Sequence, residues 1–150
     1  MVQRSVCDKL LDLSSDHALT ITDLWYKALI ANPRTASFKN MPKDILIPKV
    51  ESFFSNLKRL YFMENPYREI KDFLECNGYM DFTLSRHIPL QENIYALIMM
   101  RRHLWLYADT QAMFNTSLDM WQEVESINRT LLLFDYAIII LAEKYSLSRI

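Results

Sequence analysis

The residue with the clearest chemical potential is an aspartate inside an apolar run. Asp135 stands in LLLFDYAIIILA, Leu131–Ala142, and its neighbours three and four positions away are all leucine or isoleucine. In a helix, only those positions lie close enough to pair with it. A buried carboxylate without a partner loses its hydration and tends to take up a proton. The sequence therefore predicts that a donor from another helix meets Asp135.

The stretch LIMMRRHLW supplies the best donors for that carboxylate. Arg101 continues an apolar helical face, so we expect its guanidinium to point inward beside Arg102 and His103. An arginine fork binds a carboxylate through two parallel hydrogen bonds. One interpretation is a buried ion pair that fixes the packing of two central helices. The other is that Asp135, Arg101, Arg102 and His103 form a buried polar network that lines a pocket for a polar or anionic ligand.

Two histidines leave a haem or other tetrapyrrole protein as the alternative function. His103 follows the two arginines, and His87 precedes Ile88 and Pro89 at the entrance of a predicted helix. Either could be an axial ligand in an all-α pocket. Eight methionines are more typical of adaptable core filling than of a cofactor site. We expect no cofactor.

Catalytic and metal-binding motifs are missing from the sequence. No HExxH, CxxC or EF-hand spacing occurs, and no serine stands in a G-x-S-x-G turn. We therefore expect no protein metal site and no enzymatic activity.

The elements that must position these residues are expected to be helices. The chain has 150 residues but only one glycine, Gly78, whereas turn-rich sheet folds use glycine repeatedly. A chain of this length buries enough surface for one domain, residues 1–150. We predict an all-α single-domain structure of five to seven helices, with two long buried helices at the C-terminal end. Periodicity does not choose between a helical bundle and a globin-like arrangement.

Local signals give approximate helix limits. Ser14, Ser15 and Asp16 are expected to break the first segment, about Val2–Ala31, and to cap a second helix. Further expected features are a loop at NPRTASFKN, a helix with Pro42 or Pro48 in its first turns, a C-cap at Gly78, a helix start at Pro89 and a last helix from about Ser117 to Tyr145. The first half of that last helix should be amphipathic through Met120, Trp121, Val124 and Ile127.

Composition argues against several classes of protein. The net charge of -1 offers no field for nucleic acid. Two cysteines without metal spacing fit the reduced cytoplasm, and the N-terminus lacks the pattern of a signal peptide. The apolar run around Asp135 is shorter than the roughly 20 residues of a membrane span. We therefore expect a cytoplasmic protein with no membrane span.

Three stretches together resemble the N-terminal domain of the RsbT co-antagonist proteins of bacterial stressosomes, the RsbRD type. They are ITDLWYKALIANPRT, SRHIPLQENIYALIMMRRHLW and LLLFDYAIIILAEKY, so the resemblance covers most of the chain from about Ile21 to Tyr145. One departure is His87, which stands near a turn where members of that family often have glycine.

The resemblance implies an all-helical bacterial input domain, related in role to non-haem globin-like sensors, with no catalytic residues to carry over. Such domains commonly form homodimers and pass a signal through the C-terminal helix into an output domain. By this resemblance, the chain is a stand-alone regulator or a segment that precedes an output module. It would sense a ligand or dock a signalling-protein partner.

Overall fold

In the computed structural model, residues 8–111 and 117–148 are described, the side chains of 117–123 excepted. Within these ranges the chain forms seven α-helices and one 3₁₀-helix and no strand. The elements are α1 (Lys9–Asp16), α2 (Ala18–Ala31), η1 (Pro33–Asn40), α3 (Lys43–Tyr61), α4 (Pro66–Asn77), α5 (Tyr79–Ser85), α6 (Leu90–Thr110) and α7 (Ser117–Ser148). The prediction of an all-α fold is confirmed.

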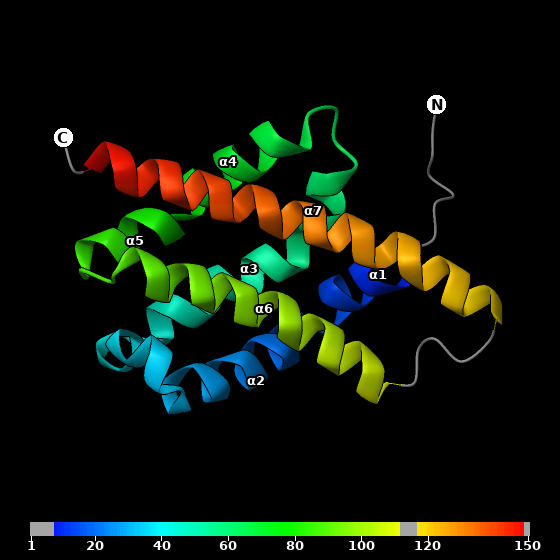
Figure 1. Ribbon diagram of the computed structural model, residues 1–150, viewed down its shortest axis with the longest axis horizontal. Helices are drawn as coiled ribbons and strands as arrows, with labels where there is room; N and C mark the ends of the chain where they lie inside the picture. Colours follow the sequence, from blue (N-terminus) through cyan, green and yellow to red (C-terminus); the bar gives the residue numbers. More distant parts are fainter. Residues whose placement is uncertain (1–7, 112–116, 149–150) are drawn as a thin grey trace.

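The helices pack as a bundle in which α6 occupies a central position. Figure 1 shows α6 between α2 and α7, and both neighbours contact it. Helix α7 lies across one side of the bundle, with α1 against its first half and α4 against its second half. The prediction of a long buried helix before the last one is confirmed for α6, in which Ala96, Leu97 and Met100 are buried.

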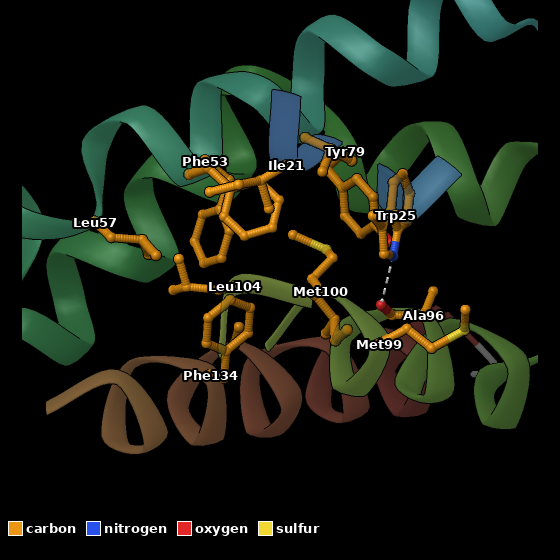
Figure 2. Packing of buried hydrophobic residues seen from close by; sticks show 14 of the residues in the cluster. Ile21, Trp25, Phe53, Leu57, Tyr79, Ala96, Met99, Met100, Leu104 and Phe134 are labelled. Atoms are coloured by element: carbon orange, nitrogen blue, oxygen red, sulfur yellow. Dashed lines mark hydrogen bonds between the residues drawn. The ribbon is translucent and has the colours of Figure 1, made fainter. Parts of the chain in front are cut away.

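One aromatic core joins most of these elements. Trp25, Phe53 and Phe134 are almost fully buried, and the rings of Phe53 and Phe134 meet edge to face with centroids 5.6 Å apart. Trp25 also donates a hydrogen bond from Nε1 to the carbonyl oxygen of Ala96, at 3.0 Å (Figure 2). This bond satisfies the polar end of a buried indole and fixes α2 against α6.

The expected helix limits are largely met where proline and glycine set them. Gly78 has φ +79° in the left-handed region and ends α4, as predicted. Pro89 stands directly before α6, and Pro42 directly before α3. Pro48 lies further inside α3, where it removes one backbone donor.

Two local predictions are wrong. The chain breaks near residue 17 as expected, but Ser14 and Ser15 do not cap α2, because their hydroxyls donate across to the carbonyl oxygens of Phe54 and Ser55 in α3. The segment predicted as a loop forms η1, which Asn32 caps by accepting a hydrogen bond from the backbone N–H of Arg34. Burial of Phe38 holds η1 in the core.

Helix α7 is long, as predicted, but it is buried along one face only. Leu133, Phe134 and Ala137 are buried, whereas Leu132 and Ile139 are exposed. Val124, predicted on the apolar face of this helix, is 57% exposed. The side chains of Met120 and Trp121, predicted on the same face, lie outside the described part of the chain, as does the predicted helix start at Val2. None of the helices in the described ranges has the length and apolar composition needed to cross a membrane.

Candidate functional site

A largely apolar groove between α6 and α7 lies beside two of the predicted site residues. Its volume is about 370 Å³, within the range of about 300 to 1,000 Å³ typical of small-molecule sites. The lining residues are Leu10, Ile98, Arg101, Arg102, Trp105, Ile127, Thr130 and Leu131. Two of the four predicted site residues, the arginines, thus line one cavity.

The predicted contact between Asp135 and Arg101 is present. Nη1 of Arg101 lies 3.6 Å from Oδ1 of Asp135, and it joins α6 to α7. The prediction that this pair is buried is wrong, because the Asp135 side chain is 58% exposed and the Arg101 side chain 28% exposed. The apolar run suggested burial on all sides of the helix. No other described element covers the face of α7 that carries Asp135, so water solvates the carboxylate.

Arg102 contacts the ring and hydroxyl of Tyr95, which lies about two turns earlier in α6. Its guanidinium carbon lies 5.8 Å from the ring centroid, and Nη2 donates to the Tyr95 hydroxyl at 3.5 Å. This donation, with a second from Asn32, lowers the pKa of Tyr95. The Arg102 side chain remains exposed at the edge of the groove.

His103 is not part of a network with Asp135. Nδ1 of His103 lies 2.9 Å from the Met99 carbonyl oxygen and bonds to it, so the histidine pairs within its own helix. His87 is exposed and has φ +59°. Neither histidine lines the groove. Haem binding stays a prediction without support from this geometry.

Metal ligands do not gather in the described part of the chain. No group of three or more histidine, cysteine, aspartate or glutamate side chains there is placed to hold a metal ion.

Sequence reasoning missed a more deeply buried ion pair. Asp8 is fully buried, and its Oδ2 lies 2.9 Å from Nη1 of Arg129 in α7. Its other oxygen accepts a hydrogen bond from the backbone N–H of Leu11 at 2.8 Å, so Asp8 also caps α1. The position of Asp8 directly before KLLDL was an available capping signal. The partner, 121 residues further along the chain, had no such signal.

A second polar cluster lies away from the groove, where α5, α6 and α7 meet. Asn93 is fully buried, accepts a hydrogen bond from the Tyr79 hydroxyl at 2.7 Å and donates to Thr83 and Tyr145. The Tyr145 hydroxyl donates in turn to the carbonyl oxygen of Ile88. Burial raises the pKa of Tyr79, and the neighbouring Tyr145 raises it further. The cluster joins three helices.

The described lining of the groove is mainly apolar. Its walls are aliphatic and aromatic, and two guanidinium groups stand at its edge. The one hydroxyl among the described lining residues, on Thr130, already donates to the carbonyl oxygen of Ser126. The lining residues include no pairing of a nucleophile with a general base.

Comparison with protein-family models, with curated proteins and with solved structures found no match to this chain.

Proposed function

We propose that the chain is a non-catalytic signalling input domain of the bacterial cytoplasm, which binds a small ligand in the groove between α6 and α7. The observation that carries the proposal is the place of this groove between the two longest helices. Ile98 and Trp105 come from α6, and Ile127 and Leu131 come from α7. A ligand there contacts both helices at once. The resemblance to the RsbRD type of input domain agrees with this assignment.

Helix α7 is the element expected to carry the signal. On the side away from the groove it packs against α4, and Tyr67 there donates a hydrogen bond to Glu143 at 3.1 Å. A ligand shifts a conformational equilibrium only if it binds two arrangements with different affinity. Because the groove consists of side chains from both helices, a change in their spacing changes the contacts of the ligand. Ligand binding and the position of α7 are thereby coupled.

Hydrogen exchange with an apolar anionic probe tests the proposal. The probe is 1-anilinonaphthalene-8-sulfonate, and amide exchange is measured with and without it. We expect its binding to slow exchange in α6 and along α7 as far as the last turns before Ser148. Probe binding without any change in the exchange of α7 would contradict the role of this helix in transmission.

Two adjacent leucines of α7 give a matched pair of variants. Leu131 and Leu132 are 37% and 36% exposed, but only Leu131 lines the groove. Leu131→Glu should abolish probe binding, because it places a carboxylate against the apolar wall. Leu132→Glu should leave probe binding unchanged. An equal effect of the two substitutions would place the probe elsewhere.

We also propose that two copies of the chain associate through the outward face of α7. Ile139 is 51% exposed on this face, beside the exposed Leu132. Apolar side chains on an uncovered helix face favour pairing with a second helix. Sedimentation velocity should show a dimer that Ile139→Glu converts to a monomer. A monomeric wild-type chain over the whole accessible concentration range would refute this part.

A further inference from the structure

We infer that the groove between α6 and α7 takes an aliphatic monocarboxylate, a ligand with one apolar chain and one carboxylate. This inference rests on the proposed function, because it names the ligand class for the same groove. It follows from three observations: the apolar walls, the position of the two arginines, and the local sum of charges.

The walls of the groove suit an aliphatic chain. Apart from the two arginines and the bonded Thr130, every lining residue in the described part of the chain is aliphatic or aromatic. Leu10 from α1 closes one side, and Trp105 presents a large apolar surface from α6. Burial of apolar surface stabilises binding by about 25 cal/mol per Å². A chain of aliphatic carbons meets apolar partners on each of the three helices.

The two guanidinium groups keep hydrogen-bonding capacity for an incoming anion. Arg101 reaches Asp135 at 3.6 Å, and Arg102 reaches the Tyr95 hydroxyl at 3.5 Å. Both distances are long, since a strong bond between a guanidinium and a carboxylate measures about 2.7 to 2.9 Å. Each guanidinium carries five N–H donors. A ligand carboxylate in the groove can therefore hydrogen-bond to one of these arginines without breaking a short native bond.

The charges at this edge match a monoanion. Arg101 and Arg102 contribute two positive charges, and Asp135 beside Arg101 contributes one negative charge. These three side chains together carry one positive charge. A ligand with a single carboxylate neutralises it, whereas a dianion would bring an uncompensated charge against apolar walls, which is costly.

Three probes of equal chain length test the inference by calorimetry on the intact protein. They are decanoate, decanol and decyltrimethylammonium, each kept below the concentration at which it forms micelles. We expect decanoate to bind at least about tenfold more tightly than decanol. The reason is that its carboxylate gains a charge-assisted hydrogen bond from an arginine. The cationic probe should bind most weakly. Equal affinities for decanoate and decanol would overturn the assignment of a carboxylate.

Arginine variants test the site of the carboxylate. Arg102→Gln should weaken decanoate binding about tenfold and leave decanol binding unchanged. The control is Arg86→Gln, because Arg86 is exposed, packs over Phe82 and lies outside the groove. It should change neither affinity. Decanoate binding that survives both Arg102→Gln and Leu131→Glu would overturn the inference.

The outcome separates this inference from the proposed function. If decanoate does not bind but the naphthalene sulfonate probe binds and protects α7, the ligand class is wrong and the input-domain proposal stands. If decanoate binds selectively but exchange in α7 does not change, the ligand class stands and the proposed transmission through α7 fails.

Discussion

At the scale of single residues, two aspartate–arginine pairs join α7 to the rest of the bundle in different surroundings. The Asp8–Arg129 pair measures 2.9 Å and has a fully buried carboxylate. The Asp135–Arg101 pair measures 3.6 Å and has a carboxylate that is 58% exposed. Exposed ion pairs contribute little to stability, whereas removing one partner of a buried pair is costly. The two pairs should therefore respond differently to the same substitution.

Replacing Asp135 tests its position at the surface. Asp135→Ala and Asp135→Leu should each change the free energy of unfolding by less than about 1 kcal/mol, since solvent screens the pair. Burial in the core would instead make Asp135→Ala costlier than Asp135→Leu. Urea unfolding followed by circular dichroism measures both variants. A loss of several kcal/mol for Asp135→Ala would show that the carboxylate is buried.

Replacing Asp8 should have a much larger effect. Asp8→Ala removes the cap of α1 and leaves the Arg129 guanidinium, 21% exposed, without its buried partner. We expect a loss of about 2 to 4 kcal/mol, less than for a fully buried pair because Arg129 reaches solvent. Asp8→Asn, which keeps a capping oxygen, should cost less than Asp8→Ala. Equal stability of the wild type and Asp8→Ala would refute the pairing.

At the scale of the elements, two turns adopt positive φ but only one has glycine. Gly78 ends α4 at φ +79°, and His87 lies before α6 at φ +59°. A side chain in the left-handed region strains the backbone, and glycine relieves that strain. Because His87 has a positive φ, a glycine at position 87 would fit this turn with less strain.

Exchanging the residue types at these turns gives opposite predictions. His87→Gly should raise the free energy of unfolding by up to about 1 kcal/mol, and Gly78→Ala should lower it by about 1 to 2 kcal/mol. At Gly78 an added Cβ would also lie 3.1 Å from Nζ of Lys49. Thermal unfolding of both variants provides the test. A destabilised His87→Gly would mean that the imidazole makes contacts worth more than the strain.

The junction of α5, α6 and α7 depends on one buried phenol. Tyr79→Phe leaves Oδ1 of the buried Asn93 without its donor and should cost about 1 to 3 kcal/mol. Burial raises the pKa of Tyr79, so the unfolded chain loses this proton first as the pH rises. The resulting contribution to stability is fully present below pH about 10, the ordinary tyrosine pKa, and is lost above it.

A comparison of unfolding at high pH checks this assignment. The free energy of unfolding of the wild type should fall more steeply above pH 10 than that of Tyr79→Phe. The difference between the two slopes should correspond to one linked proton. Both proteins share all other ionisable groups, so the difference isolates Tyr79. Parallel pH profiles would contradict the role of this phenol.

At the scale of the whole molecule, the helices share one core. Phe134 of α7 packs against Phe53 and Phe54 of α3, and Trp25 of α2 bonds to Ala96 of α6. The groove lies at the margin of this core, so a ligand there can alter the α6–α7 contact while the remaining helices stay packed.

A shared core predicts cooperative unfolding. Far-ultraviolet circular dichroism, which reports helix content, and near-ultraviolet circular dichroism, which reports aromatic packing, should give the same thermal midpoint. Helices α1 and α7 should therefore melt together with α2, α3 and α6. An earlier loss of the near-ultraviolet signal would indicate that part of the aromatic packing is lost before the helices unfold.

The sequence by itself determined the fold class, the helix limits set by Gly78 and Pro89, and the partner of Asp135. These features depend on local backbone preferences and on helical periodicity, which neighbouring residues set. Tertiary structure decided that η1 is helical, because burial of Phe38 holds that segment in the core. It also decided which face of α7 is covered. An apolar helix face is buried only where another element reaches it, and the partners of Asp8 and Asn93 come from distant parts of the chain. Asp135 therefore has the predicted partner at the surface, while the groove beside it exists only because α6 and α7 leave space between them.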